Sequence, residues 1–373
     1  MTNPISLYLQ ERINAGDFPS ASYLVGERGV PIVQGSLGNA VVVPNVISAA
    51  DDTIYDLASL TKPVITGLLT AIFIERGMLS LDHRVSVYLG EFDVDGKRMI
   101  TIRDLISHTS HLPAWRPLYM LTDDRSRVIS LIGQMEVEFS TDAVVYGDPN
   151  FIVLGAILER LASCSLDELA AAEILKPLAL KSTFFNPPAT IQKRIAASEM
   201  GNGFEADACI SAGFADAALS DDNLRKDLIW GVVHDGNAFF LGGVAGHAGL
   251  FSCSHDLFIL AKQFLPSTSQ LLSPETCSYF LQNLTPGMNE HRSLGFQLAS
   301  TPGSTAGGQM PLESFGHLGF TGTSLWIDPV NERIFILLTN RTHMIEPPFV
   351  NINSVRRRFH DLAVSELGNS RAT

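Results

Sequence analysis

The chain has 373 residues and a formal net charge of -13 at pH 7, with hydrophobic residues at 46% and charged residues at 17%. This composition is typical of a globular protein with a large core and about two or three domain-sized units. The acidic balance excludes a nucleic-acid partner, because no basic cluster is present to replace the counterions of phosphates. We expect the one basic run, Arg356-Arg357-Arg358, to be the solvent-exposed face of a C-terminal helix.

The sequence indicates neither export nor a membrane span. Residues 1–12 read as an amphipathic helix, without the basic and long apolar regions of a signal peptide. No stretch approaches the roughly eighteen uninterrupted apolar residues that a membrane span needs. The four cysteines are scattered without CxxC spacing, which suits a reducing compartment and suggests neither a disulfide frame nor a zinc site. We therefore expect a cytoplasmic protein without a membrane partner.

The first elements after this helix form a predicted hairpin. Residues 21–26 and 31–35 are short β-prone runs around the turn Glu27-Arg28-Gly29. A helix is then expected from Ser59 to a break at Gly77.

Ser59 and Lys62 are three residues apart at the start of that helix. Residues i and i+3 share a helix face, so the hydroxyl and the amine come within hydrogen-bond reach. An amine that is kept neutral can take the proton of a serine and so activate it as a nucleophile. A chance Ser-x-x-Lys is expected on the order of once in such a chain, so the motif needs support from elsewhere in the sequence.

From residue 79 to about residue 228 the sequence changes character. Helical patterns at residues 102–106, 151–161 and 166–175 are separated by proline-containing loops, and few strand runs appear. We interpret residues 79–228 as a mostly helical domain inserted into the rest of the chain.

The last part of the chain returns to a mixed pattern. Residues 242–251 are glycine-rich but lack the Gly-Lys-Ser/Thr ending of a phosphate loop, so we interpret them as a tight structural loop. An amphipathic helix at residues 256–264 follows. Residues 323–328 and 333–339 then predict a second hairpin, whose apolar second strand belongs in the centre of a sheet. A helix over residues 350–367 ends the chain.

These elements predict an α/β protein of the α+β type. Residues 1–78 and 229–373 would form one sheet domain built from both ends of the chain, and residues 79–228 the helical domain.

A serine–lysine mechanism also needs a second proton carrier and donors for the oxyanion. Tyr146, in the polar run Tyr146-Gly147-Asp148 at a helix start, can be that carrier, although a tyrosine in such a place is more often a packing residue. The glycines of residues 315–323 let an edge strand approach a ligand closely and offer backbone N–H groups.

In this order the motifs resemble those of the serine β-lactamase and penicillin-binding-protein family, most closely its class C and esterase-like branch. Ser59-Leu60-Thr61-Lys62 corresponds to the first motif, Tyr146-Gly147-Asp148 stands where the family has Tyr-x-Asn, and His317-Leu318-Gly319 stands where it has Lys-Thr-Gly. The likeness covers nearly the whole chain. It implies a β-lactamase/transpeptidase-like fold, a mainly antiparallel sheet flanked by helices, with the active site between the sheet and the inserted helical region.

The resemblance also implies roles for single residues. Ser59 would be the acylated nucleophile, and Lys62 and Tyr146 would share the proton transfers, either of them being the acylation base. The backbone N–H groups of Ser59 and Phe320 would form the oxyanion hole. No cofactor is implied.

Departures from the family pattern bear on the substrate. Asp148 replaces a neutral amide and cannot donate a hydrogen bond; it is expected to pair with Lys62 and to raise the pKa of that lysine. Leu318 removes a hydroxyl, and His317 replaces a permanent charge with a group that titrates near neutral pH. With Gly319 these residues form the expected substrate-binding edge, and the weaker recognition of a carboxylate favours esterase or peptidase activity over efficient β-lactamase activity.

Several histidines raise the question of a metal. The sequence contains no His-Glu-x-x-His, and loose clusters of this kind are more often structural, so we assign no metal site. A weaker expectation places four residues at the rim of the pocket: His234, Asp235, Asn237 and His247.

The sequence therefore predicts a serine hydrolase for a small ester, amide or peptide substrate. A D-alanyl carboxypeptidase, a D-amino-acid peptidase or a weak β-lactamase is the alternative within this class. A non-catalytic peptide or muropeptide binder is the alternative outside it. The presence of Ser59, Lys62 and Tyr146 together favours an enzyme, because a binder needs none of them. The sequence indicates no oligomeric state.

Overall fold

The computed structural model describes residues 3–137, 143–214, 224–344, 346 and 348–369. Within them the main layer is an antiparallel seven-stranded sheet in the order β3-β2-β1-β10-β9-β8-β7. Its strands are β1 (Ser20–Glu27), β2 (Val30–Val41), β3 (Ile47–Ser48), β7 (Gln297–Leu298), β8 (Phe315–Leu318), β9 (Ser324–Asp328) and β10 (Arg333–Thr339). Both predicted hairpins are confirmed, and the two ends of the chain build one sheet.

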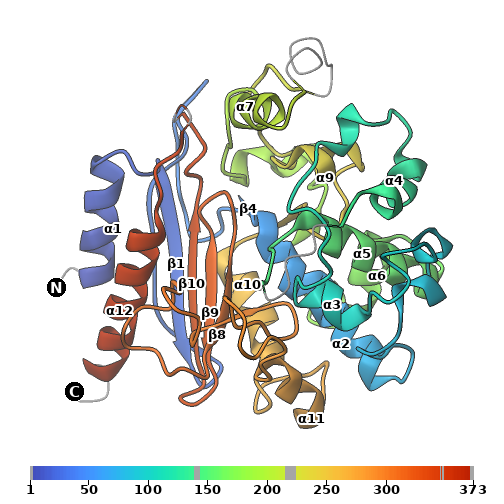
Figure 1. The fold of residues 1–373 in the computed structure, drawn as a ribbon. Helices are drawn as coiled ribbons and strands as arrows, with labels where there is room; N and C mark the ends of the chain where they lie inside the picture. The colour runs from blue at the N-terminus through green and yellow to red at the C-terminus, as the bar shows by residue number, and fades with distance from the viewer. Residues whose placement is uncertain (1–2, 138–142, 215–223, 345, 347, 370–373) are drawn as a thin grey trace.

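Helices cover both faces of this sheet (Figure 1). They are α1 (Pro4–Asn14), α2 (Leu68–Glu75), α3 (Ile102–Ile106), α4 (Val128–Gln134), α5 (Asp148–Ala162), α6 (Leu166–Ala170), α7 (Gly203–Ser211), α9 (Gly236–Phe240), α10 (Ser254–Ala261), α11 (Pro274–Cys277) and α12 (Asn353–Asn369). Helices α1 and α12 lie on one face, and α10 and α2 lie on the opposite side, toward the helical region.

Strand β10 is central in the sheet, as its apolar sequence predicts, and all its residues are buried. Because side chains alternate along a strand, β10 contributes side chains to the cores on both faces of the sheet. Ile334, Ile336 and Leu338 belong to the large core shared with α2 and α10, whereas Phe335 and Leu337 belong to the core under α1 and α12. The sheet is therefore held from both sides by apolar packing.

Between residues 79 and 228 the described residues add no strand to the seven-stranded sheet. Their helices include α3 and α5, where helical patterns were predicted. The pattern at 166–175 forms α6 and then a π-helical turn, Ala171–Leu175. A small second sheet, β4-β6-β5, joins Tyr55–Asp56, Leu250–Ser252 and Phe184–Phe185. The division of the chain into two domains stays a prediction.

The segment that begins at Ser59 is less regular than the single helix we expected. A 3₁₀ turn over Ala58–Leu60 is followed by a π-helix over Lys62–Gly67, and α2 begins only at Leu68. Pro63 supplies no N–H to the first turns, and π-turns inside helices frequently occur at functional sites.

By length and composition, the stretch Ala58–Glu75 passes the test for a membrane span, which the sequence analysis did not anticipate. Its mean hydropathy is 1.3, but 83% of it is buried inside the protein, as in the core helix of a globular domain. Helix α5 and the helical residues after it pass the same test only as a pair bent by 73°.

Candidate active site

Ser59 lies on a short turn that the carboxylate of Asp56 holds in place. Asp56 accepts the N–H of Ala58 at 2.8 Å through Oδ1 and the N–H of His234 at 2.8 Å through Oδ2. Ala58 has a φ of 48°, in the left-handed region that residues with side chains seldom adopt. Strained backbone of this kind clusters at active sites. The turn presents the half-buried hydroxyl of Ser59 to a pocket.

The side chain of Lys62 is fully buried, and its nitrogen contacts three oxygen atoms. Nζ lies 2.8 Å from Ser59 Oγ, 2.8 Å from Asp148 Oδ1 and 3.2 Å from the carbonyl oxygen of His247. An ammonium has three donors, so each one finds a partner here. Burial alone would lower the pKa of Lys62, but the charges of Asp148 and Tyr146 and hydrogen bonds to both raise this pKa above its ordinary value. Lys62 therefore keeps its proton, as the replacement of an amide by Asp148 led us to expect.

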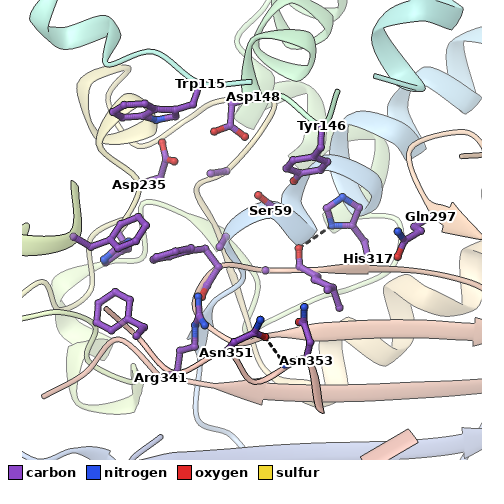
Figure 2. A pocket seen from close by; sticks show the side chains of 18 of the residues that line it. Ser59, Trp115, Tyr146, Asp148, Asp235, Gln297, His317, Arg341, Asn351 and Asn353 are labelled. Carbon is purple, nitrogen blue, oxygen red and sulfur yellow. Dashed lines mark hydrogen bonds between the residues drawn. The ribbon is translucent and has the colours of Figure 1, made fainter. Parts of the chain in front are cut away.

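Tyr146 precedes α5 and faces two cationic side chains. Its ring centroid lies 5.0 Å from Lys62 Nζ and 5.3 Å from the guanidinium carbon of Arg292. The rings of His108 and His317 contact it at centroid separations of 4.6 and 5.7 Å. These contacts fix the tyrosine ring, and the two positive charges favour negative charge on its oxygen. Figure 2 shows Tyr146 beside His317 at the pocket.

His317 is neutral in this structure. Its Nδ1 lies 2.9 Å from the carbonyl oxygen of Leu318, and its Nε2 has no partner among the described residues. Burial, followed by the positive charges of Arg292 and Lys62, lowers the pKa of His317 well below its ordinary value. The expectation that this residue titrates near neutral pH is therefore wrong. Nδ1 donates to the backbone, which leaves Nε2 as an acceptor.

Gly319 ties the end of β8 to the serine turn. Its N–H donates to Thr323 O at 2.9 Å, and Thr323 Oγ1 donates to Leu57 O at 3.1 Å. A Cβ at position 319 would lie 1.9 Å from Thr323 Oγ1 and 2.5 Å from Leu57 O, so the close approach requires glycine. Phe320 follows and lines the same pocket as Ser59. The oxyanion role of their N–H groups stays a prediction.

Of the glycine-rich residues 242–251, residues 242–249 form a structural loop packed against α5, and the last two begin β6. Thr66 Oγ1 donates to Gly246 O at 2.7 Å, and a Cβ at Gly246 would lie 2.0 Å from Phe151 O. This close packing places the carbonyl group of His247 next to Lys62. The loop thus supplies one of the three acceptors that hold the ammonium.

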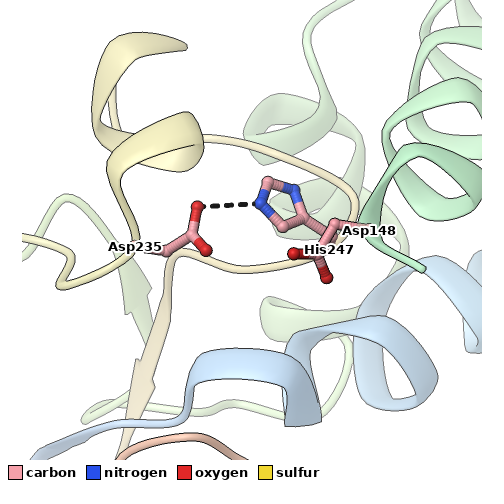
Figure 3. Close-up of side chains that lie close together, drawn as sticks. All are labelled: Asp148, Asp235 and His247. Atoms are coloured by element: carbon pink, nitrogen blue, oxygen red, sulfur yellow. Dashed lines mark hydrogen bonds and ion pairs between the residues drawn. The ribbon is translucent and has the colours of Figure 1, made fainter. Parts of the chain in front are cut away.

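Asp148, Asp235 and His247 lie close together (Figure 3). Asp148 and the carbonyl oxygen of His247 both contact Lys62. One ligand atom from each lies within 4.8 Å of the others, a spacing that a metal ion would tolerate. Each acidic group already has a partner: Asp148 contacts Lys62 at 2.8 Å, and Asp235 Oδ1 lies 2.9 Å from His247 Nε2. A metal would have to compete with the Lys62 ammonium for Asp148, so we assign this cluster to the lysine rather than to a metal.

The pocket around Ser59 has a volume of about 840 Å³. Of the predicted site residues it is lined by Ser59, Tyr146, Asp148, His234, Asp235, His317, Leu318, Gly319 and Phe320. His247 is fully buried behind this wall. Asn237 is buried as well, accepts the N–H of Leu118 and donates to the carbonyl oxygen of Arg116. It therefore fixes the loop that carries Trp115 into the pocket, rather than lining the rim as expected.

Besides Arg292, two arginines that line the pocket, Arg341 and Arg356, were not predicted as site residues. Arg356 was expected on an exposed helix face, but it is only 5% exposed and donates to Gly319 O at 2.7 Å and to Thr323 O at 2.9 Å. Burial, and then the charge of Arg341, lower its pKa to about 9. Neither arginine forms an ion pair within the described part of the chain. The helical periodicity of α12 could have indicated that Arg356 is buried, because it puts Arg356 on the same face as the buried His360.

Glu205, on α7, brings a buried carboxyl group to the wall of the pocket. It accepts the hydroxyl of Tyr119 at 2.9 Å and the N–H of Gly236 at 3.1 Å. Burial, and then the negative charge of Asp235, raise the pKa of Glu205 to about 8, although Arg225 acts in the opposite direction. Near neutral pH this carboxyl group is therefore largely protonated.

The chain is similar to known proteins in both sequence and fold. The Beta-lactamase family model matches residues 6–356. A protein of Salmonella agona, named "Putative D-alanyl-D-alanine carboxypeptidase", is 30% identical over 379 residues, which covers 93% of this chain and 84% of the relative.

Solved structures with the same fold include hydrolases of different substrate classes. EstCE1, described as a hydrolase with promiscuous acyltransferase activity, superposes with a TM-score of 0.73 at 19% identity, over 96% of this chain and 97% of its own. A class C beta lactamase from Rhodobacter sphaeroides gives a TM-score of 0.71 at 18% identity, over 98% of this chain and 100% of its own. At these identities the likeness confirms the predicted fold alone.

The raised pKa of Glu205 predicts how stability changes with pH. A carboxyl group whose pKa is higher in the folded state contributes stability below its unfolded value, and this contribution is lost as pH rises through the folded value. As the pH rises from about 4.5 to about 8, the unfolding temperature of the native protein should therefore decrease relative to that of Glu205→Gln, which has no such group. The exposed Asp207→Asn, on the same helix, is the control and should track the native curve. Parallel curves for the native protein and Glu205→Gln would contradict the assignment.

Proposed function

The chain belongs to the beta-lactamase family of serine hydrolases, and from that premise we propose that Ser59 forms a covalent acyl-enzyme with a small ester or amide substrate. The observation that carries the proposal is the contact between Lys62 Nζ and Ser59 Oγ at 2.8 Å, at the base of a pocket of about 840 Å³. A buried lysine fixed on a serine hydroxyl at a strained turn is an arrangement for activating that hydroxyl.

In this proposal Tyr146 is the acylation base and Lys62 stays an ammonium. The raised pKa of Lys62 removes it as a neutral proton acceptor. In this step Tyr146 reacts as a phenolate, whose negative charge Lys62 and Arg292 face, and it takes the proton of Ser59 while the serine oxygen attacks the carbonyl carbon. The N–H groups of Ser59 and Phe320 would bind the oxyanion.

The remaining steps follow from the same groups. Tyr146 returns its proton to the leaving group as the carbon–oxygen or carbon–nitrogen bond breaks, which leaves the acyl ester on Ser59. Water then attacks this ester, giving one proton to Tyr146, and the acid leaves as Ser59 recovers its proton. Each proton taken up by Tyr146 is thus given back within one half-reaction.

The substrate proposal favours esters over β-lactams. Asp148 cannot donate a hydrogen bond to an acylamide carbonyl, and its Oδ1 is already engaged by Lys62 at 2.8 Å. Neutral His317 offers no charge to a substrate carboxylate, and Leu318 offers no hydroxyl. These features leave the nucleophile in place while removing contacts that a β-lactam would use.

A D-alanyl carboxypeptidase or D-amino-acid peptidase is the second candidate, and one observation favours it. Arg356 is buried in the pocket wall, has no ion-pair partner among the described residues, and its Nε forms no hydrogen bond there. Such a guanidinium would suit the terminal carboxylate of a peptide. The name printed for the Salmonella relative points to the same substrate class. A cytoplasmic location also stays a proposal, supported by the four cysteines, none of which forms a disulfide in the part of the chain that the structure describes.

The first test is covalent labelling with a fluorophosphonate. We expect the adduct on Ser59, and we expect Tyr146→Phe to slow labelling and ester hydrolysis by about two to four orders of magnitude, the usual effect of removing acid–base help. Tyr279→Phe, which lies outside the pocket lining, is the matched control and should react at the native rate.

Two outcomes would overturn the proposal. An adduct mapped by mass spectrometry to another serine would exclude Ser59 as the nucleophile. A Tyr146→Phe variant with a native acylation rate would exclude the phenol as the base. In the same assays, a short acyl ester, a D-Ala-D-Ala peptide and a cephalosporin decide the substrate class: we expect the ester to react fastest, and a faster peptide would replace our first candidate with the second.

A further inference from the structure

Three phenylalanines from distant parts of the chain meet in the pocket of Ser59. Phe204 lies on α7, Phe320 follows β8, and Phe349 precedes α12. The ring centroids of Phe204 and Phe320 are 4.5 Å apart, those of Phe204 and Phe349 5.6 Å, and those of Phe320 and Phe349 5.8 Å. All three residues line the pocket. We call these residues the aromatic wall.

The aromatic wall is held in place but is not covered. Arg341 donates through Nε to Phe320 O at 2.7 Å and through Nη1 to Val350 O at 2.9 Å. Its guanidinium carbon lies 4.9 Å from the ring centroid of Phe320 and 5.9 Å from that of Phe349, within cation–π range. Phe204 is nevertheless 36% exposed, and Phe320 and Phe349 are only half-buried. Rings that only packed the core would be covered, so this apolar surface fits a ligand group.

The other side of the pocket is polar. His317 and Gln297 lie on the opposite side of Ser59 from Arg341 (Figure 2). Arg292 belongs to the polar side as well, because its guanidinium carbon lies 5.3 Å from the ring of Tyr146, which in turn contacts His317. Ser59 therefore stands between an aromatic half and a polar half.

The position of Tyr146 decides which half takes which part of the substrate. In the proposed mechanism Tyr146 gives its proton to the leaving atom, and a general acid must lie within hydrogen-bond reach of that atom. Since Tyr146 contacts His317 and Arg292, the leaving group belongs in the polar half. The acyl group is then directed to the aromatic wall.

The charges around the aromatic wall further restrict which acyl groups can bind there. Among the described residues, four carboxyl groups line the pocket. Asp148 pairs with Lys62, Asp235 with His247 and Glu290 with Arg292, and Glu205 is largely protonated near neutral pH, so none of them is left to attract a cation. Arg341 has no ion-pair partner among the residues that the structure describes, and burial lowers its pKa to about 10. A neutral or anionic acyl group therefore suits this half, and a cationic one does not.

We propose that the aromatic wall is an acyl-binding subsite, and that the preferred substrates are esters or amides of neutral or anionic arylalkanoic acids with a polar leaving group. This inference rests on the proposed function, because it assumes that Ser59 is acylated and that Tyr146 protonates the leaving atom. It assigns to Phe204, Phe320 and Phe349 a role in selecting the acyl group.

The test compares esters that share one leaving group. We would measure kcat/KM for p-nitrophenyl acetate, hexanoate and phenylacetate, each divided by the rate constant of its spontaneous hydrolysis. Because one aryl group is buried, we expect the normalised kcat/KM of the phenylacetate ester to exceed that of the acetate ester by about ten-fold or more. Because the aryl group stacks on the rings, its normalised kcat/KM should also exceed that of the hexanoate ester. Phe204→Ala should reduce the phenylacetate-to-acetate ratio several-fold. Leu312→Ala, which removes a 68% exposed side chain outside the pocket lining, is the control and should keep the native ratio.

The outcomes separate this inference from the proposed function. If all three esters react at equal normalised rates, or hexanoate equals phenylacetate, the aromatic subsite is wrong while the Ser59 chemistry stands. If Phe204→Ala keeps its native unfolding temperature and the native ratio, the wall does not select the acyl group. If no ester reacts and fluorophosphonate leaves Ser59 unlabelled, the proposed function itself fails.

Discussion

The buried ion pair between Lys62 and Asp148 constrains the rest of the site. A lysine with no exposed surface must either lose its proton or find a counter-charge and further acceptors. Here it finds Asp148 at 2.8 Å, together with the oxygen atoms of Ser59 and His247. Removing one partner of such a pair typically costs about 3–5 kcal/mol. The pair therefore fixes both the position of the nucleophile and the protonation state of its neighbour.

Segments distant in sequence have to meet for this pair to form. Ser59 and Lys62 follow the small sheet at Tyr55–Asp56, Asp148 begins α5, and His247 lies on the glycine-rich loop. The loop approaches α5 so closely that Gly246 has no room for a side chain beside Phe151 O. Gly246 is thus explained by close packing next to a charged group.

Much of the fold could be predicted because it depends on local patterns. The two hairpins, the central position of β10 and helix α5 follow from periodicity and turn residues. The proximity of Ser59 and Lys62 is also local, since they are three residues apart. The pairing of Lys62 with Asp148 could also be predicted, because a carboxylate at position 148 stands where the family has an amide and so adds a negative charge.

Features that depend on burial by distant segments could not be predicted from local sequence patterns. Burial and then the charge of Arg292 lower the pKa of His317 well below its ordinary value, and neither effect is visible in its own segment. Arg356 was expected in solvent because two of the three adjacent arginines are indeed exposed, yet the helix period turns the first one toward Gly319. The aromatic wall was missed for a related reason, since its members come from three segments that only the tertiary fold brings together.

The charge of Lys62 decides which group is the acylation base, and it can be measured by NMR with ¹³C-labelled lysine. The Lys62 resonance, assigned by its loss in Lys62→Met, should remain at the ammonium position as pH is raised to the ordinary lysine value, about 10.4. In Asp148→Asn burial is no longer opposed by the carboxylate, so the same resonance should titrate at a lower pH. A native Lys62 that loses its proton near neutral pH would contradict the account and return the role of acylation base to the lysine.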